Sequence, residues 1–246
     1  MMELRAEKIS QDFLRYSAKD GYFVAVAETN LTLAAGTLTA VTGRSGSGKS
    51  TLLHILGGLM KPVTGRVLLD ETDLYALDED TRTRLRSRHI GIVPQRLMSL
   101  AALSVRENIL LSALLTGTQE NVAARADELM ERLDIRKLAS VAPAELSGGE
   151  LRRATIARAL VMKPAILLAD EPTGDLDEEN THSVLRLLRE TADAGAAVLL
   201  VTHESDARNY ADTCYTMTAG KLEQVKQRVL HFFMDSSYNV RKEGEQ

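Results

Sequence analysis

A short apolar run over residues 38–42 is followed at once by a glycine-rich segment, Gly43-Arg44-Ser45-Gly46-Ser47-Gly48-Lys49-Ser50, and then, from Thr51, by a helical pattern. The segment fits the pattern G-x4-G-K-[ST], which binds nucleotide phosphates when a strand precedes it and a helix follows it. Glycines let backbone N–H groups turn toward phosphate oxygens, and the helix adds its positive N-terminal end. The order of strand, loop and helix therefore predicts an α/β fold with a nucleotide site over residues 43–51.

Two side chains of this loop have distinct expected roles. Lys49 supplies a point charge for the β- and γ-phosphates, and the Ser50 hydroxyl is the expected ligand of Mg²⁺. The alternative is a glycine- and serine-rich turn that contains a lysine by chance. The flanking strand and helix patterns favour the phosphate loop.

Two adjacent carboxylates, Asp170 and Glu171, follow a second apolar run over residues 165–169. Ligands of open α/β sheets bind beyond the carboxyl ends of the strands, so both side chains are expected beside the phosphates. We expect Asp170 to hold Mg²⁺ together with Ser50, and Glu171 to orient or deprotonate the water that attacks the γ-phosphate. The alternative is a pair of acids that caps a helix starting at Pro172.

Further apolar runs over residues 90–93 and 196–202 predict two more strands of a parallel sheet, because they lack the alternation of a sheet with one solvated face. Helical spacing of apolar residues predicts helices over residues 120–138 and 179–193. Residues 97–163 show helix-like patterns and no strand, which predicts a helical subdomain inserted into the α/β core. Residues 225–246 are expected to form an appended helix with a frayed end.

The segment Leu146-Ser147-Gly148-Gly149-Glu150 precedes another helical stretch over residues 151–162. Ser147 and Glu150 have the spacing of a capping box, which leaves Gly148 and Gly149 in a first turn with free N–H groups. Such a helix end binds anions. A well-capped helix without a ligand is the alternative.

Composition narrows the class of partner and the compartment. The chain has 246 residues, and 30 Lys and Arg against 34 Asp and Glu leave a net charge of −4, so no basic field favours nucleic acid. Cys214 is the single cysteine, which excludes an intrachain disulfide and a cysteine-rich zinc site. No secretory signal is visible, and the apolar runs are far shorter than the roughly 20 residues of a membrane-spanning helix. These features predict a cytoplasmic protein.

The phosphate loop, the segment 146–150 and the segment Leu168-Ala169-Asp170-Glu171-Pro172-Thr173-Gly174-Asp175-Leu176-Asp177 together resemble the ATP-binding subunit of an ATP-binding cassette (ABC) transporter. The resemblance covers roughly residues 3–224. It implies a P-loop NTPase core of the RecA-like type with a parallel central sheet, a β-subdomain and an inserted helical subdomain. It also implies an ATPase that forms a homodimer in the ATP-bound state, in which Ser147, Gly148 and Gly149 contact ATP held by the partner subunit.

The same resemblance implies roles for single residues. Gln95 is similar to the glutamine that contacts Mg²⁺ or the attacking water, although from the residues alone it reads as a polar loop residue after Pro94. His203 resembles the histidine that contacts the γ-phosphate; a structural histidine at a strand end is the alternative. Asp177 resembles the aspartate that communicates across the dimer, and it is also placed to cap a helix.

An aromatic residue before the phosphate loop is implied to stack on adenine. Tyr16 lies 27 positions before Gly43 and is the expected residue, with Tyr22 and Phe23 as competitors. Three positions depart from the family pattern: Glu150 stands where glutamine is usual, Asp175 where close relatives often have asparagine, and Pro94 where an aromatic residue is common. None of them removes a catalytic group.

The segments 50–59 and 168–174 further resemble the macrolide-export and lipoprotein-release subfamily, MacB/LolD-like, which is itself similar to the cell-division protein FtsE. The resemblance implies a separate FtsX/MacB-like membrane permease as partner and a place on the inner face of the cell membrane. A soluble or regulatory ABC ATPase, such as an FtsE-like assembly factor, is the alternative. The arginines at positions 82, 84, 86 and 88 form a solvated face or, as the alternative, a permease-docking surface.

Overall fold

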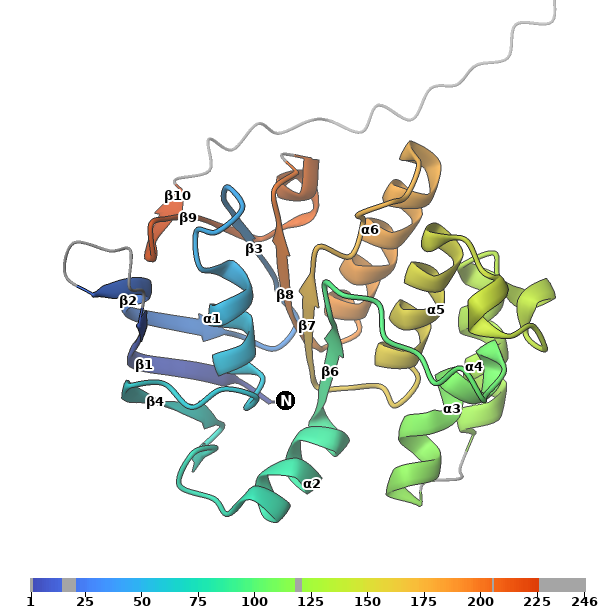
Figure 1. The fold of residues 1–246 in the computed structure, drawn as a ribbon, viewed down its shortest axis with the longest axis horizontal. Helices are drawn as coiled ribbons and strands as arrows, with labels where there is room; N and C mark the ends of the chain where they lie inside the picture. Colours follow the sequence, from blue (N-terminus) through green and yellow to red (C-terminus); the bar gives the residue numbers. More distant parts are fainter. Residues whose placement is uncertain (1, 15–20, 118–120, 205, 226–246) are drawn as a thin grey trace, which may run out of the picture.

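The structure is a computed structural model that describes residues 2–14, 21–117, 121–204 and 206–225 (Figure 1). Tyr16 lies outside the described residues. So does the helix expected over residues 225–246, apart from Val225, which ends a strand.

A six-stranded sheet forms the centre of the molecule, in the order β10-β9-β3-β8-β7-β6. The expected strands are confirmed to within one residue at each end, and they pair in parallel. The sheet comprises β3 (Leu38–Thr42), β6 (Ile90–Val93), β7 (Ile166–Asp170), β8 (Ala197–Thr202), β9 (Thr213–Thr218) and β10 (Lys221–Val225). Every residue of β3, β7 and β8 is buried, which explains why these strands read as continuous apolar runs.

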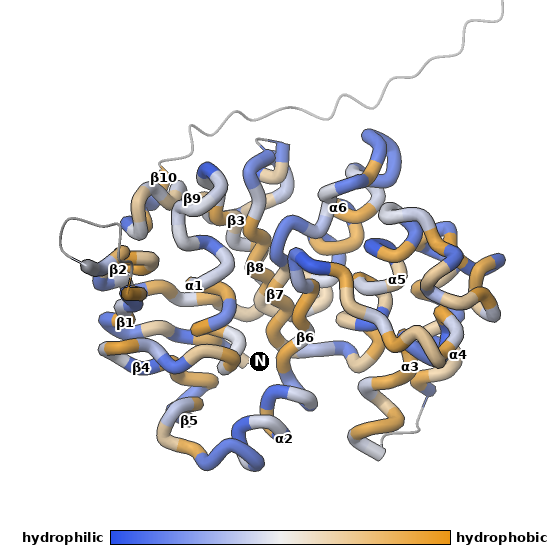
Figure 2. Tube along the Cα trace, viewed as in Figure 1, coloured by the Kyte–Doolittle hydropathy of each residue, from blue (hydrophilic) through white to orange (hydrophobic). Residues whose placement is uncertain are grey.

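Successive residues of the central strands point to two different cores. In β8, Leu199 and Val201 join the core under the second sheet, whereas Val198 and Leu200 join the core under the helices. Figure 2 shows these strands in orange at the centre of the molecule, while α2 (Glu79–His89) is largely blue. The parallel sheet is therefore covered on both faces.

A smaller antiparallel sheet, in the order β2-β1-β4-β5, covers one face. It comprises β1 (Leu4–Leu14), β2 (Tyr22–Leu33), β4 (Thr64–Leu69) and β5 (Thr72–Asp73). Its register shifts three times along β1, and Lys8 has a φ of 48° there. These register shifts interrupt the alternation of apolar and polar residues, so the residue pattern did not predict the strands. Only the resemblance to the family implied a β-subdomain.

Helices fill the remaining layers. They are α1 (Lys49–Leu56), α2, α3 (Val105–Thr116), α4 (Val122–Arg132), α5 (Gly148–Leu160) and α6 (Glu178–Asp193), with 3-10 turns at Arg136–Leu138, Pro143–Glu145 and Asp206–Tyr210. The single helix expected over residues 120–138 is wrong in its last turns. Asp134 has a φ of 51°, so the chain leaves the helix after Arg132 and resumes as a 3-10 turn.

The described part of residues 97–163 contains helices and 3-10 turns but no strand. These helices lie to one side of the sheet in Figure 1, and they share a single apolar cluster with α6 and with one face of β7 and β8. Their role as a separate helical subdomain stays a prediction. Within the described ranges, no helix reaches the length and apolar character that a bilayer crossing requires.

Candidate nucleotide-binding site

The glycine-rich loop after β3 packs closely against the main chain of β2 and β9. A Cβ atom at Gly48 would lie 1.8 Å from the carbonyl oxygen of Ala25, and one at Gly43 would lie 2.4 Å from that of Met217. Gly48 also has a φ of 109°, which side chains rarely adopt. Both positions therefore require glycine, and α1 begins at the next residue, Lys49, with its N–H groups at the loop.

Lys49 is folded back over this loop. Its Nζ donates hydrogen bonds to the carbonyl oxygens of Gly43, at 2.8 Å, and Arg44, at 3.1 Å, and lies 3.9 Å from Oε1 of Glu171. The side chain is buried. A buried cation is thus held where it faces both the loop and the acid at the end of β7.

Asp170 ends β7 with its side chain almost wholly buried. Its Oδ1 atom has no hydrogen-bond partner among the described residues. Burial raises the pKa of Asp170, while a hydrogen bond with Ser50 and the charges of His54 and Lys49 act to lower it. A buried carboxylate oxygen and a neighbouring hydroxyl are suitable ligands for a hard cation such as Mg²⁺.

Glu171 follows with an unusual backbone conformation, a φ of 50°. Its Oε2 accepts hydrogen bonds from Nδ1 of His203 at 2.9 Å, from the Thr202 hydroxyl at 3.1 Å and from the His203 N–H at 3.3 Å. Non-glycine residues held at positive φ cost free energy and cluster at functional sites. The structure thus brings Glu171, His203 and Lys49 together, as the sequence-based hypothesis requires.

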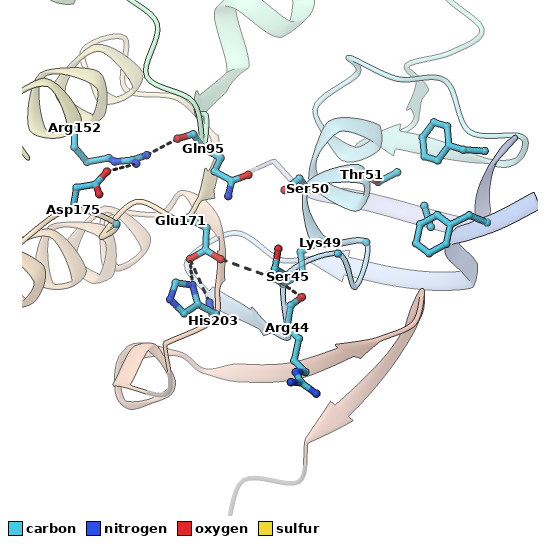
Figure 3. A pocket seen from close by; sticks show the side chains of 16 residues that line it. Arg44, Ser45, Lys49, Ser50, Thr51, Gln95, Arg152, Glu171, Asp175 and His203 are labelled. Carbon is cyan, nitrogen blue, oxygen red and sulfur yellow. Dashed lines mark hydrogen bonds and ion pairs between the residues drawn. The ribbon is translucent and has the colours of Figure 1, made fainter. Parts of the chain in front are cut away.

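These side chains surround a cavity of about 730 Å³ (Figure 3). Its walls come from the glycine-rich loop, the start of α1 and the ends of β6, β7 and β8. Residues expected in the site that line it include Arg44, Ser45, Ser50, Thr51, Gln95 and His203. The volume lies in the range that suits a small-molecule ligand.

Two phenylalanines also line the cavity. Phe13 of β1 and Phe23 of β2 are paired across the antiparallel sheet, and both line the cavity together with Thr51. Phe23 was among the expected competitors, whereas Phe13 was missed. No sequence pattern pointed to Phe13, which lies three residues before Tyr16. Tyr22, the other competitor, does not line the cavity.

A second cavity, of about 440 Å³, lies at the N-terminus of α5 and is lined in part by Ser147, Gly148, Gly149 and Asp177. The expected capping box is confirmed: the Glu150 N–H donates to Oγ of Ser147 at 3.3 Å, and the Ser147 N–H donates to Oε2 of Glu150 at 2.8 Å. This leaves the first-turn N–H groups of α5 facing the cavity.

Asp177 caps α6, because its Oδ1 accepts a hydrogen bond from the Asn180 N–H at 2.8 Å. That bond, with a second from the Asn180 side chain, lowers the pKa of Asp177. The helix-cap alternative for Asp177 is therefore observed.

Within one chain the structure does not bring these two cavities together into one site. Of the residues that line them, Asp175 alone belongs to both within the described part of the chain. Within the described residues, Ser147, Gly148 and Gly149 line the second cavity and do not line the first.

Comparisons with known proteins all find ATP-binding proteins of ABC transporters. A sequence model described as "ABC transporter" matches residues 26–174. The chain is 42% identical over 204 residues to the lipoprotein-releasing system ATP-binding protein LolD of Shewanella sp. (strain MR-4), across 82% of this chain and 88% of LolD. It is 38% identical over 208 residues to the macrolide export ATP-binding/permease protein MacB of Bordetella avium (strain 197N), across 84% of this chain but 32% of MacB.

The fold also matches solved structures. It aligns with the ATP-binding cassette MJ0796, in a dimeric post-hydrolysis state bound to ADP and Pi, with a TM-score of 0.83 and 29% identity, across 91% of this chain and 99% of that one.

Proposed function

Because this chain belongs to the ABC transporter family as an ATP-binding subunit, we propose that it hydrolyses ATP to drive a separate membrane permease. One observation carries the proposal most directly. The carboxylate of Glu171 lies 2.9 Å from His203 Nδ1 and 3.9 Å from Lys49 Nζ, beside a loop that requires glycine at positions 43 and 48. This is a base, a proton-bearing ring and a fixed cation around one phosphate site.

ATP enters with its triphosphate on the loop of residues 43–50. Backbone N–H groups of the loop and of the first turn of α1 bind the phosphate oxygens, and Lys49 exchanges its two carbonyl partners for the β- and γ-phosphates. The adenine base packs against Phe13, which lines the cavity. These contacts fix the γ-phosphate toward Glu171.

Ser50, Asp170 and Gln95 are the residues that would hold Mg²⁺. When bound, Mg²⁺ neutralises charge that develops on the β- and γ-phosphate oxygens. No cluster of three or more His, Cys, Asp or Glu side chains within the described ranges forms a metal site of its own. A hydroxyl and a buried carboxylate that share the cation with phosphate oxygens fit a substrate-dependent site of this kind.

In the hydrolytic step, Glu171 orients a water molecule and accepts its proton as the water oxygen bonds to the γ-phosphorus and the bond to the ADP oxygen breaks. Lys49 and His203 stabilise the charge on the transferring phosphoryl group. Oε2 of Glu171 is hydrogen-bonded to His203 at 2.9 Å, and Oε1 lies 3.9 Å from Lys49 Nζ.

The second half of each site comes from a partner copy. Ser147, Gly148 and Gly149 present a helix N-terminus that lies outside the first cavity of its own chain, and head-to-tail pairing of two chains would place it against the γ-phosphate. Asp177 lies at the same face. MJ0796, with which the fold aligns, is itself described as a dimer.

The permease is the proposed membrane partner. MacB is named for ATP-binding and permease activity, and this chain corresponds to about a third of it. LolD, which the chain matches over most of its length, is named as the ATP-binding protein of a lipoprotein-releasing system. These relatives favour a transport subunit at the cytoplasmic face of the membrane over a soluble or FtsE-like regulatory ATPase.

Glu171→Gln tests the proposal, because it keeps the size of the side chain and removes the base. We expect the unaltered chain to hydrolyse ATP with Mg²⁺, and the variant to lose at least about 100-fold in rate, the contribution of a general base. Size-exclusion chromatography of the variant should show a dimer with ATP and Mg²⁺ and a monomer without them.

Glu128→Gln, at an exposed position of α4, is the matched control and should behave as the unaltered chain does. An unaltered chain without turnover would contradict the proposed activity. A Glu171→Gln variant that binds ATP and stays monomeric would contradict the homodimer.

A further inference from the structure

Arg152 is a buried arginine that contacts both loops flanking the nucleotide cavity. It lies on α5 with its side chain 5% exposed. Its Nη1 donates hydrogen bonds to the carbonyl oxygens of Gln95, at 2.9 Å, and Pro94, at 3.4 Å, while Nη2 lies 3.5 Å from Oδ2 of Asp175. Figure 3 shows the guanidinium between Gln95 and Asp175. One side chain thus joins the loop after β6 to the loop after β7.

The chemistry of the contact requires an arginine. A guanidinium presents donors in a rigid planar fork, so it can bind two carbonyls on one side and a carboxylate on the other, which a lysine ammonium does less well. A buried cation also needs a counter-charge. In the described part of the chain, Asp175 is the one carboxylate within 4.0 Å of this guanidinium.

Asp175 contacts the guanidinium although its own side chain is exposed to solvent. Its side chain is 70% exposed, its φ is 66°, and it lines both the nucleotide cavity and the cavity at the N-terminus of α5. It is also the position where close relatives in the family often have asparagine. A carboxylate there is explained by the arginine that faces it.

The position of α5 allows the contacts of Arg152 to transmit movement between the subunit interface and the nucleotide cavity. The N-terminus of α5 is the surface proposed to meet the partner's ATP, and Arg152 lies one turn into the same helix. Its guanidinium holds the main chain of Gln95, whose side chain lines the nucleotide cavity, and the loop that begins at Glu171. A displacement at the partner-facing end of α5 is therefore passed to both loops.

We propose that Arg152, together with Asp175, is a positioning residue that holds Gln95 and the loop after Glu171 in register with the N-terminus of α5, so that hydrolysis occurs only when the partner is seated. The inference rests on the proposed function. It does not make Arg152 a ligand of the nucleotide, although the side chain borders the cavity.

A double-mutant cycle tests this proposal through Arg152→Gln, Asp175→Asn and the double variant. Each single variant should lower kcat about 10- to 100-fold, the range that a misplaced catalytic group costs. The Kd for a fluorescent ATP analogue should stay within about threefold, because the phosphate loop and Phe13 are untouched. The double variant should be no slower than Arg152→Gln alone, since the two residues act as one unit. Arg152→Lys should restore only part of the rate.

Arg125 and Glu128 on α4 provide a matched control pair. Arg125 donates to the Leu160 carbonyl oxygen at 3.3 Å and lies 4.0 Å from the exposed Glu128 carboxylate, so it has the same kinds of partner far from the cavity. Arg125→Gln and Glu128→Gln should leave kcat unchanged. Asp175→Asn alters an exposed side chain and keeps the test valid should Arg152→Gln not fold.

The outcomes separate the two proposals. An unaltered chain that does not hydrolyse ATP, with no ATP-driven dimer of Glu171→Gln, contradicts the proposed function. An active unaltered chain whose Arg152→Gln and Asp175→Asn variants keep full kcat, or whose defects multiply in the double variant, contradicts the positioning role. A raised Kd with an unchanged kcat would make Arg152 a nucleotide ligand and would also overturn it.

Discussion

At the scale of single residues, Asp170 couples stability to the chemistry of the site. Burial raises its pKa above the ordinary value of 3.8, so the folded protein binds this proton more tightly than the unfolded chain does. The stability linked to this carboxyl is therefore greatest at low pH and falls as the pH rises from 3.8 through the raised pKa. At neutral pH the ionised group destabilises the fold until a cation binds it.

Asp170→Asn should consequently stabilise the protein and inactivate it. We expect the melting temperature without Mg²⁺ to rise, because the amide places no charge in the buried site. ATP and Mg²⁺ should raise the melting temperature of the unaltered chain more than that of the variant. Thermal unfolding at pH 7 and an ATPase assay measure both effects, and a lowered melting temperature would contradict the account.

Phe13 and Tyr16 compete for the role of the base-stacking residue. Phe13→Ala should weaken ATP binding about fivefold or more, because stacking on an aromatic ring contributes about 1–3 kcal/mol per base. Phe13→Tyr should keep the affinity, and Tyr16→Ala should change it less than twofold. Titration with a fluorescent ATP analogue decides between them. The reverse pattern would return the role to Tyr16.

The residues of the site differ in how visible they are in the sequence. Lys49 could be predicted from the phosphate-loop pattern, and Glu171 from its place at the end of a buried strand. The role of His203 was implied by the resemblance to the family. Arg152 could not, because its partners lie 57 and 23 positions away, counting from Gln95 to Arg152 and from Arg152 to Asp175. Phe13 was not predicted either, because no sequence pattern shows that this residue of β1 lines the cavity.

At the scale of elements, α3 and α5 begin with the same device. Ser104 forms a capping box with Glu107, as Ser147 does with Glu150, but Ser104 lines neither of the two cavities. Loss of either serine hydroxyl removes a helix cap, which costs about 1 kcal/mol of stability.

Ser104→Ala and Ser147→Ala should therefore lower the free energy of unfolding by similar amounts and differ in function. In a Glu171→Gln background, Ser147→Ala should weaken the ATP-driven dimer at least about threefold, because one γ-phosphate hydrogen bond is lost at each site. Ser104→Ala should leave the dimer unchanged. Denaturant unfolding and analytical ultracentrifugation measure the two effects, and equal effects on the dimer would contradict the role of Ser147.

Elements differ in predictability for a physical reason. The strands β3, β7 and β8 are buried on both faces, so their sequences are continuously apolar and stand out. In β1 the register shifts break the alternation, and in α4 a single residue at positive φ, Asp134, ends the helix although the apolar spacing continues to Leu138. Backbone conformation at one position is not encoded in apolar periodicity.

At the scale of the whole molecule, one apolar cluster runs from α3 and α4 through α5 to the central sheet and α6. The helices within residues 97–163 therefore have no core of their own, and movement of α5 must be accommodated by the packing against β7 and β8. This supports the proposal that the helical region and the ATP-binding core respond to the nucleotide together. The contacts of Arg152 with Gln95 and Asp175 also join α5 to the loops after β6 and β7.

The separation of the phosphate loop from the N-terminus of α5 has a consequence for mixtures of defective chains. Glu171→Gln disables one half of a site, and Gly148→Asp, where a Cβ has room at 3.7 Å from Asp175, disables the other by placing a negative charge against the phosphate. Each pure variant should be inactive. Each mixed dimer would contain one intact site built from the two sound halves, so the mixture should show ATPase activity that neither pure variant has. Such complementation would show that each active site is built from residues of two chains.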